Sequence, residues 1–403
     1  MDGKRLIHTL TLRNFLSFGA DAQEIELQPL NVLIGPNASG KSNLLEALSV
    51  LQATPRDLAG LIRRGGGVGE WLWKGGEASP TAEISAVIDY PERETPLGYQ
   101  LCFTSVGQRF GVADERVWHD RGTDRHYHYV WQGGQPAIVS RQDPEEDTGT
   151  VGTPARVAHF LGEHELSPEQ SVLSQRQDPE HYPEVTYLGR QFNQMRLYTD
   201  WNLGRKSPPR LPQLPDLPSD FLLEDASNLG LVLNDLQHRR DPWQQLLADL
   251  QKLYDAAEQL TVRILGGTVQ VFLHERGLTQ PVPATRLSDG ILRFLCLLSI
   301  VRHPEPPPVV CIEEPELGLH PDIIPLVGEL LLEASERTQL VVTTHSETLV
   351  SALTEVPEAI IVCERDDRGT QLRRLEADKL RDWLTSYALG EVWRMGEIGG
   401  TRW

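Results

Sequence analysis

Residues 35–42 read Gly35-Pro36-Asn37-Ala38-Ser39-Gly40-Lys41-Ser42, and this G-x-x-x-x-G-K-S pattern is that of a phosphate-binding loop. The apolar segment 29–34 precedes it and suits a buried strand, while the leucine-rich segment 43–51 follows with helical spacing. Strand, glycine-rich loop and helix together form the context that the motif requires. The sequence therefore predicts a nucleotide site at this loop.

Each part of the loop has a physical role in holding phosphate. The glycines let the backbone turn its N–H groups toward a phosphate chain, and the following helix directs its positive end to the same place. Lys41 is expected to reach the β- and γ-phosphates, and the Ser42 hydroxyl is expected to bind Mg²⁺. The predicted ligands are thus ATP and Mg²⁺, and the contacting residues are Asn37, Ala38, Ser39, Gly40, Lys41, Ser42 and Asn43.

Composition narrows the class of protein. The chain has 403 residues, of which 39% are hydrophobic and 24% charged, as in soluble globular proteins. Its longest apolar helical run, residues 291–301, contains Arg293 and is too short to span a bilayer. The N-terminus lacks the apolar core of a signal peptide, and the four cysteines form no C-x-x-C pair. We expect a reduced cytoplasmic protein without a membrane anchor.

The net charge of −19 argues against a surface that is basic all over and binds nucleic acid without specificity. A local basic groove stays open, so DNA remains a candidate partner. The basic groups that could line it are Arg63-Arg64, Arg205-Lys206 with Arg210, and Arg239-Arg240. Such groups are more often ordinary solvated surface.

A second group of candidate catalytic residues follows another apolar segment. Residues 308–312 read as a buried strand, and the strand ends at Glu313 and Glu314. An apolar strand ending in two acids is the Walker B arrangement: the first acid supports Mg²⁺ and the second orients and deprotonates the attacking water. The metal residues predicted here are therefore Ser42 and Glu313, and the general base is Glu314.

Two shorter patterns flank the Walker B strand. Leu287-Ser288-Asp289-Gly290 precedes a predicted helix and resembles the signature motif of ABC-type ATPases. Ser288 and Gly290 at a helix N-terminus can bind a γ-phosphate, but not the one held by the loop of the same chain. His345 follows the apolar segment 339–344 and resembles the switch histidine that contacts the γ-phosphate in those ATPases. The catalytic residues expected are thus Lys41, Glu314 and His345.

The order of these motifs resembles the ABC-type ATPase superfamily on its RecF/SMC/OLD side. The run Ile-Glu-Glu-Pro-Glu-x-Gly-Leu-His-Pro at 312–321 is similar to predicted RecF-like ATPases, and it gives the D-loop role to residues 318–320. The opening Leu-Arg-Asn-Phe-Leu-Ser-Phe at 12–18 is similar to their first strand, which passes near the base and implies contacts from Arg13 and Asn14. The resemblance covers residues 1–100 and 260–365, and it assigns no glutamine-loop residue.

The resemblance implies an α/β fold: an ABC-type P-loop ATPase head, with a mixed sheet flanked by helices and an antiparallel β subdomain. We expect residues 1–145 to form the N-terminal part of the head. Residues 146–258 are expected to form a mainly helical insertion lobe. Residues 259–403 are expected to hold the signature motif, Walker B, the switch histidine and a tryptophan-rich tail.

Two functions are consistent with these patterns. The first is an ATP hydrolase that works as a head-to-tail homodimer, or a higher homo-oligomer, around shared ATP. Members of the resembling group serve as ATPases of antiviral defence or DNA transactions beside a separate nuclease or toxin effector. No nuclease is expected on this chain, because only 58 residues follow His345 and the cluster Glu364, Asp366 and Asp367 is too small and too close to the end for the TOPRIM nuclease domain of some relatives. The second is a scaffold or switch that binds ATP, hydrolyses it slowly or not at all, and holds a partner protein. A transporter ATPase is a weaker third alternative.

Two local features leave alternatives open. His126-x-His128 places two imidazoles on one strand face, where an exposed sheet surface is favoured over half a metal site. The tail carries Trp383, Trp393 and Trp403, which must pack on something. A strap over the chain's own sheet is favoured, and a docking element for a partner is the alternative.

Overall fold

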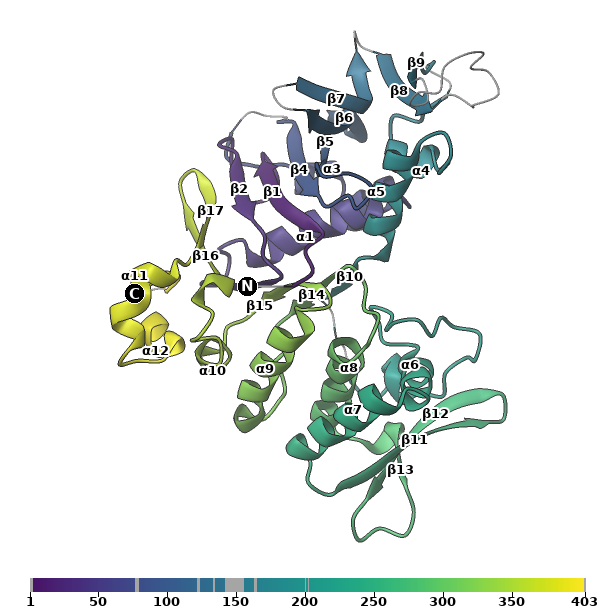
Figure 1. Cartoon of the computed structure of the whole chain (residues 1–403), viewed down its shortest axis with the longest axis vertical. Coiled ribbons are helices and arrows are strands. Elements are labelled where there is room, and N and C mark those ends of the chain that lie inside the picture. The colour runs from purple at the N-terminus through teal and green to yellow at the C-terminus, as the bar shows by residue number, and fades with distance from the viewer. Residues whose placement is uncertain are drawn as a thin grey trace.

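The computed structural model describes residues 3–76, 80–121, 124–132, 135–141, 156–162, 165–199, 201 and 203–401. Figure 1 shows an elongated molecule with an antiparallel sheet at one end, a second sheet in the middle, and a helical region with a small third sheet at the other end. The chain therefore has the mixed α/β architecture that the sequence predicts. Among the described residues, no helix is long and apolar enough to span a membrane.

The antiparallel sheet has eight strands in the order β2-β1-β4-β5-β6-β7-β8-β9. Alternate residues of β4, from Ala82 to Ile88, are buried, so one face of the sheet packs inward. The antiparallel β subdomain that the resemblance implies is therefore present. The bounds are β1 Ile7–Arg13, β2 Gln23–Glu26, β4 Ala82–Ile88, β5 Leu97–Val106, β6 Arg109–Arg121, β7 Asp124–Gln132, β8 Gln135–Arg141 and β9 Arg156–Phe160.

The central sheet has the order β10-β14-β15-β3-β16-β17, in which all neighbouring strands are parallel except the antiparallel pair β16 and β17. All residues of β3 and β15 are buried, as expected of parallel strands covered on both faces. The bounds are β3 Leu30–Ile34, β10 Arg196–Tyr198, β14 Val309–Glu313, β15 Gln339–Thr343, β16 Ile360–Asp366 and β17 Gly369–Arg374.

The central sheet separates two hydrophobic cores. Val310 and Ile312 of β14 belong to one core, and Val309 and Cys311 belong to the other, because successive side chains point to opposite faces. The first core includes α6 Leu229–Gln237, α7 Arg240–Leu253, α8 Asp289–Val301, α9 Ile324–Ala334 and the small sheet β11 Ala257–Leu265, β12 Thr268–Glu275 and β13 Val282–Pro283. The second includes α1 Lys41–Ala53, α2 Leu58–Arg64, α3 Val68–Trp71, α4 Val172–Gln175 and α5 Pro183–Gln194.

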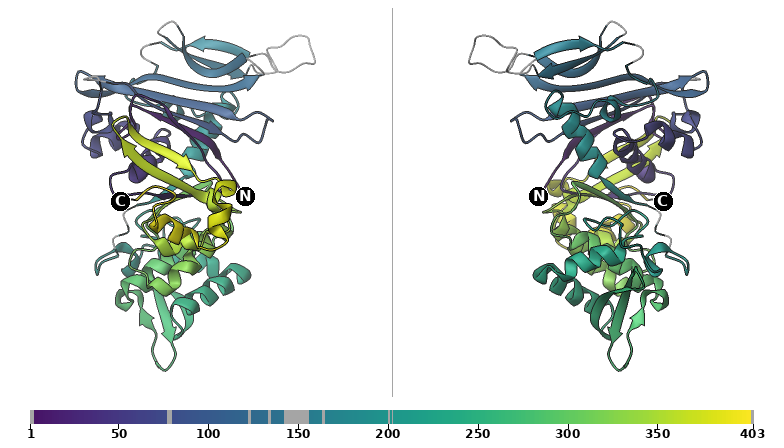
Figure 2. Two further views of the ribbon diagram at one scale, coloured as in Figure 1. Left: turned by 90° about the vertical axis from the view of Figure 1, so that its left-hand side faces the viewer. Right: turned by 90° about the vertical axis from the view of Figure 1, so that its right-hand side faces the viewer.

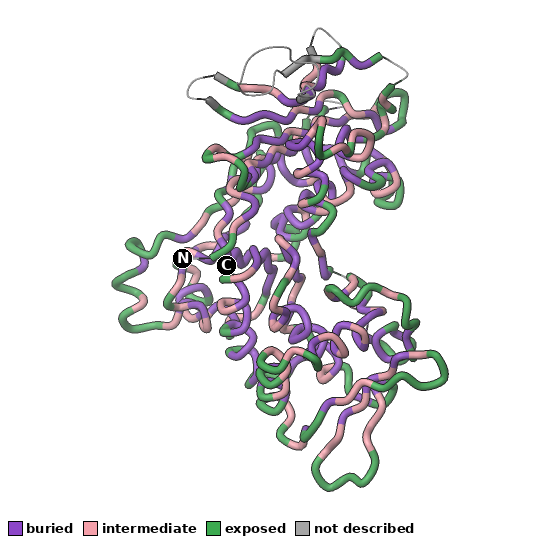
Figure 3. Tube along the Cα trace, turned by 45° about the vertical axis from the view of Figure 1, so that its right-hand side comes forward, coloured by how far each residue is buried: buried purple, intermediate pink, exposed green. Residues whose placement is uncertain are grey.

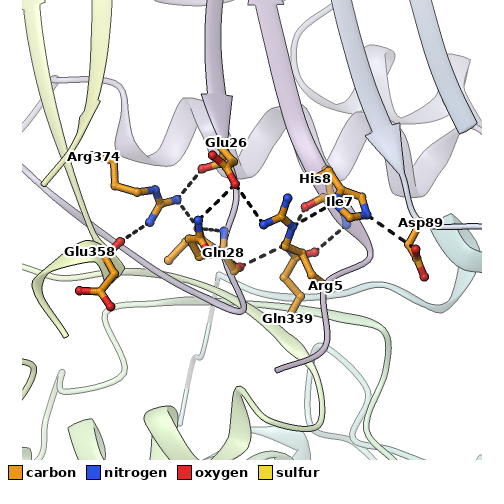
Figure 4. A network of polar contacts seen from close by, with 10 residues as sticks. Arg5, Ile7, His8, Glu26, Gln28, Asp89, Gln339, Glu358 and Arg374 are labelled. Atoms are coloured by element: carbon orange, nitrogen blue, oxygen red, sulfur yellow. Dashed lines mark hydrogen bonds and ion pairs between the residues drawn. The ribbon is translucent and has the colours of Figure 1, made fainter. Parts of the chain in front are cut away.

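Polar contacts join the two large sheets close to the N-terminus (Figure 4). Gln339, at the start of β15, accepts a hydrogen bond from Ile7 N at 2.8 Å and donates to Ile7 O at 2.8 Å and to Gln28 O at 3.2 Å. Arg374 of β17 donates to Glu26 O and Glu358 O, each at 2.6 Å. The side-chain amide of Gln339 thus fixes β1 against β15, the strand that leads to His345.

Residues 146–258 do not form the single helical lobe that the sequence predicted. α5 packs against α1 and β7, so it belongs with the antiparallel sheet. β10 pairs with β14 in the central sheet, because its apolar Leu197 and Tyr198 are buried there. Of the helices in this range, α6 and α7 lie beside α8 in the helical region. In Figure 2 they belong to the teal and green helices at the lower end of the molecule.

The exposed strand face expected at His126-x-His128 is not found, because α5 covers it. His128 is 1% exposed, and its Nε2 lies 2.8 Å from His119 Nδ1. Glu184 of α5 lies 3.4 Å from His128 Nδ1, and Arg93 contacts both Glu184 and His119. Within the described residues, no group of three metal-binding side chains occurs, so these histidines form a buried polar network.

The tail folds back over the central sheet after α11 Ala377–Leu384 and α12 Leu389–Arg394. Trp393 donates to Gly400 O at 3.3 Å, and Gly400 N donates to Glu364 of β16 at 2.9 Å. Ile398 between them is buried. These contacts agree with the predicted strap, whereas Trp383 is 36% exposed and Trp403 lies outside the described residues.

Candidate functional site

The phosphate loop connects β3 to α1, as predicted. Gly35, Ala38 and Gly40 have φ values of +150°, +65° and +105°, which give the loop its tight curl at the N-terminus of the helix. A Cβ at Gly40 would lie 2.2 Å from Thr370 Oγ1, so only glycine fits against β17. Asn37 and Ala38 are exposed at the tip, and Ser39 is buried beneath them.

Lys41 lies across the loop. Its ammonium donates to Gly35 O at 2.8 Å and to Pro36 O at 3.0 Å, and the residue is only 6% exposed. Burial lowers the pKa of Lys41, while the negative charges of Glu314 and Glu313 act in the opposite direction. The charged end of Lys41 is therefore held at the loop, where it can transfer its hydrogen bonds to phosphate oxygens.

The two predicted metal residues touch each other. Ser42 Oγ donates to Glu313 Oε1 at 2.6 Å, which joins the first turn of α1 to the end of β14. A hydroxyl and a carboxylate are oxygen ligands of the kind that Mg²⁺ accepts beside phosphate oxygens, so these residues fit the ion. Glu313 is thus long enough to reach Ser42 directly, although the first Walker B acid is usually Asp.

Glu314 and His345 lie at the same edge of the sheet, because β14 and β15 are parallel neighbours. His345 Nε2 is 3.6 Å from Glu314 Oε1. Glu314 has a φ of +44°, and its backbone N donates to Thr343 O at 3.0 Å. A left-handed conformation is uncommon for glutamate, and here it directs the side chain away from the line of β14.

Glu316 is a site residue that the sequence did not reveal. Its Oε1 accepts hydrogen bonds from Thr344 Oγ1 at 2.5 Å and from His345 N at 3.1 Å. Burial raises the pKa of Glu316. The carboxyl group therefore ties the segment after Walker B to the backbone of His345. The only signal for it was a third acid close behind Glu313 and Glu314.

The signature residues begin α8, as predicted. Ser288 caps the helix by accepting a hydrogen bond from Ile291 N at 3.3 Å. A Cβ at Gly290 would lie 3.1 Å from Gly318 O, so the helix start lies against the D-loop segment. Within the described residues, no hydrogen bond joins Ser288 or Gly290 to the phosphate loop of the same chain.

Arg210 supports the signature segment, although the sequence placed it in a basic surface patch. The residue is 5% exposed, and its guanidinium donates to Leu203 O at 2.9 Å, to Leu287 O at 2.5 Å and to Ala284 O at 3.4 Å. It also pairs with Asp289. Its hydrogen bonds are used inside the protein, so Arg210 is not available to a nucleic-acid backbone.

Thr199 lies at the carboxyl end of β10, next to the Walker B strand. It lines a cavity of about 340 Å³ together with Ser42 and Glu313. The other polar residues of the lining are Glu46, Ser49, Gln52 and Glu224. No local pattern marks this position, because a three-residue strand followed by threonine is not distinctive.

Arg13 and Asn14 lie next to the turn that contains Ser17, which supports the phosphate loop through hydrogen bonds. Arg13 Nε donates to Ala20 O at 2.9 Å, and Asn14 Nδ2 donates to Thr81 O at 3.3 Å. The following Ser17 makes the connection to the site, because Asn43 Nδ2 donates to Ser17 Oγ at 2.6 Å. Ser17 Oγ lies 2.7 Å from Thr370 Oγ1, which donates to Ser39 O at 2.9 Å.

Comparison with known proteins assigns this site to a family. The family described as "AAA domain, putative AbiEii toxin, Type IV TA system" matches residues 30–351, which include the phosphate loop, the signature motif, Walker B and His345. The Smc chromosome partition protein of Cereibacter sphaeroides is 34% identical over 93 residues, which are 22% of this chain and 8% of that protein. The Old nuclease of Escherichia phage P2 is 39% identical over 79 residues, which are 19% of this chain and 13% of that protein.

Solved structures agree on the fold. An Smc head bound to the C-terminal winged-helix domain of ScpA has a TM-score of 0.55 and 14% identity, with 93% of this chain and 99% of that chain covered. An Smc head with an extended coiled coil bound to the C-terminal domain of ScpA, from Pyrococcus furiosus, has a TM-score of 0.54 and 12% identity, with 94% and 98% covered. The expected RecF/SMC/OLD-like ABC ATPase fold is confirmed.

Proposed function

We propose that this chain, which belongs to that family of AAA domains, binds ATP with Mg²⁺ at the phosphate loop and hydrolyses it. The observation that carries the proposal is the hydrogen bond of 2.6 Å between Ser42 and Glu313, with Glu314 and His345 at the same sheet edge. A phosphate loop beside two acids and a histidine is the arrangement that phosphoryl transfer to water requires.

Each residue has a distinct task in this reaction. Lys41 binds the β- and γ-phosphates, and Ser42 and Glu313 hold the metal ion, which neutralises phosphate charge when bound. Glu314 orients the attacking water and takes its proton. His345, whose backbone is fixed by Glu316, contacts the γ-phosphate next to Glu314.

The complete site needs a second copy of the chain. Ser288 and Gly290 lie at the N-terminus of α8, and such a helix end binds anions. Since neither is bonded to the phosphate loop of its own chain, they would act on the γ-phosphate held by a partner copy. The resulting homodimer is head-to-tail, with two ATP molecules between the subunits.

The biological setting follows from the relatives rather than from the site. A toxin appears in the family's description, and one relative is the Old nuclease of a phage. We therefore place the ATPase in antiviral defence or DNA transactions, acting with a separate effector.

A slow ATP-dependent switch is the second candidate function. Two similar Smc heads are bound to ScpA domains, so a head of this fold can hold a partner protein.

Steady-state hydrolysis of ATP with Mg²⁺, measured with and without DNA, tests the proposal. Turnover by the wild type, and its loss in Glu314→Gln, is the expected result. Tight ATP binding by wild type with no turnover under either condition would reject hydrolysis and favour the switch. If the wild type does not bind ATP at all, both functions are rejected.

A further inference from the structure

A cavity of about 360 Å³ lies between the antiparallel sheet and residues 166–170, which precede α4 (Figure 1). This volume is within the range of sites that hold small organic molecules. Three neighbouring strands form its floor, through Val112 of β6, Tyr129 and Trp131 of β7, and Pro136 of β8. None of the residues that line it belongs to the phosphate loop, the Walker B strand or the signature segment.

Backbone hydrogen bonds hold the opposite wall of the cavity against this floor. Val112 N donates to Pro168 O at 2.8 Å on one side, and Leu161 N donates to Pro136 O at 2.8 Å on the other. The two prolines have a fixed φ angle, which stiffens the backbone at both attachments. The cavity is therefore preformed, and a ligand need not order its walls.

Apolar and aromatic residues form most of the lining, and a few polar groups are buried among them. Glu115 and Tyr129 are only 1% and 2% exposed, and Trp131 is half-buried. Tyr129 and Trp131 are two residues apart on β7, so both side chains lie on the same face of the sheet. A largely apolar cavity with a small number of buried polar groups is typical of small-molecule sites.

Two hydrogen-bond donors lie close together in this wall. The indole N–H of Trp131 is buried and has no hydrogen-bond partner in the described part of the chain. Burial raises the pKa of the neighbouring Tyr129, and the indole N–H lowers it by a smaller amount, so the hydroxyl keeps its proton and can donate. A buried donor without an acceptor costs about 1–3 kcal/mol. The wall is therefore suited to a ligand that supplies an acceptor atom.

The charge of the lining disfavours ionic ligands. Among the described residues that line the cavity, Glu115 is the only one with a carboxyl or a cationic group. An anion would face Glu115 with no cation in the lining to offset it. A cation would find both carboxyl oxygens engaged, because Oε1 accepts from Tyr99 and Ser171 and Oε2 accepts from Val172 N.

We propose that this cavity binds a small, neutral, planar heteroaromatic molecule, which packs on the aromatic side chains of β7 and presents a ring acceptor atom to the indole N–H of Trp131. Aromatic rings pack favourably on one another, and the paired donors give the site its selectivity. The inference is independent of the proposed hydrolysis of ATP, because the two sites share no residue.

Benzimidazole and indole are suitable probes, because they have the same planar bicyclic shape but only benzimidazole carries a ring acceptor. Ligand-observed NMR titrations above neutral pH, where benzimidazole is uncharged, measure the two dissociation constants. We expect the wild type to bind benzimidazole with a Kd of about 1 mM or lower, and about tenfold more tightly than indole. Saturating ATP should leave benzimidazole binding unchanged.

Variants of two different strands locate the probe in the cavity. Trp131→Phe keeps an aromatic wall and removes the N–H, so it should weaken benzimidazole binding about tenfold and leave indole binding unchanged. Val112→Phe fills the space and should weaken the binding of both probes by more than about tenfold. Trp118→Phe makes the same change at a buried tryptophan of β6 that does not line the cavity, so this matched control should bind both probes like the wild type.

Several results would overturn the proposal. Wild-type protein that binds neither probe would do so, and so would equal affinity for the two probes. A preference for benzimidazole that persists in Trp131→Phe would reject the indole N–H as the donor. Binding that persists in Val112→Phe, or that ATP displaces, would place the probe outside this cavity. Val112→Phe keeps the test decisive should Trp131→Phe fail to fold.

Discussion

Arg210 pairs with Asp289 while its guanidinium also donates to Leu287 O, so one buried side chain holds both sides of Ser288. The arginine lies 79 residues before its partner, in a 3₁₀ turn at Pro208–Arg210. The 3₁₀ turn that carries Arg210 therefore supports the start of α8.

Arg210→Ala should weaken hydrolysis without abolishing ATP binding. It leaves three carbonyl oxygens without their donor, which should lower the free energy of unfolding by about 2–4 kcal/mol. Denaturant unfolding and steady-state ATPase assays measure the two effects. Arg205→Ala, at an exposed position nearby, is the control and should change neither. An Arg210→Ala protein with wild-type turnover would contradict a role in positioning Ser288.

Lys41→Ala and Glu314→Gln should separate ATP binding from hydrolysis. The first removes the buried cation from the loop and should weaken ATP binding strongly. The second keeps the size of the side chain but removes the base, so ATP should still bind and the nucleotide-bound dimer should accumulate. Calorimetry and size-exclusion chromatography with ATP measure these effects. Wild-type turnover by Glu314→Gln would refute the general-base assignment.

Ser288→Arg should bind ATP and fail to hydrolyse it, because it blocks the site of the opposite subunit while its own phosphate loop is unchanged. Mixing it with Lys41→Ala should restore one composite site in each mixed dimer. Turnover is measured across mixing ratios, with each variant alone as the control. Mixtures that never exceed the sum of the separate variants would contradict a shared site.

Glu115 should make stability depend on pH. It is fully buried and accepts hydrogen bonds from Tyr99 at 2.7 Å and Val172 N at 2.8 Å, and burial raises its pKa above the ordinary value of 4.5. As pH rises from about 4.5 toward the raised folded pKa, the unfolded chain releases a proton that the native protein retains. Stability should therefore fall through this window.

Glu115→Gln should remove the loss of stability that Glu115 causes as the pH rises. The Tm of this variant minus the Tm of wild type should therefore increase as the pH is raised from 4.5. Thermal unfolding across this range is the measurement. Glu94→Gln, at an exposed position in the connection between β4 and β5, provides the matched control and should follow the wild type. Parallel Tm curves for Glu115→Gln and wild type would refute the prediction.

Deletion of residues 396–403 should destabilise the protein if the tail is a strap. Ile398 is buried, and the deletion also removes the acceptors of Trp393 and Arg373. Burial of one large aliphatic side chain and two hydrogen bonds corresponds to about 3–5 kcal/mol. A lower Tm supports the strap, whereas a stable truncated protein that no longer assembles supports docking. A truncated protein that is stable, assembled and active would reject both.

The parts predicted well from the sequence are those with local patterns. The phosphate loop, the Walker B strand and the capped start of α8 each depend on residues close together in the chain, so spacing and composition identify them. The hairpin of β11 and β12 is also local, because Gly266-Gly267 joins its two strands directly. Its tip is exposed, as the colours of Figure 3 and the 68% exposure of Ile264 show.

The parts that were missed depend on distant partners. β10 is only three residues long and forms a strand because it pairs with β14. No local sequence pattern reveals this pairing. From the sequence, Arg210 resembled a surface residue, because its partners Leu287 and Asp289 are distant in the chain. His128 looked exposed because its cover, Glu184, belongs to a helix more than fifty residues later.

The order of strands in the central sheet also has a consequence for biosynthesis. β3, which leads into the phosphate loop, lies between β15 and β16, whose residues come more than three hundred positions later. Pairings between such distant segments form slowly, and the N-terminal part of a chain leaves the ribosome first. The apolar strand 30–34 must therefore wait, unpaired, until nearly the whole polypeptide has been made, and this interval is when a chaperone would be needed most.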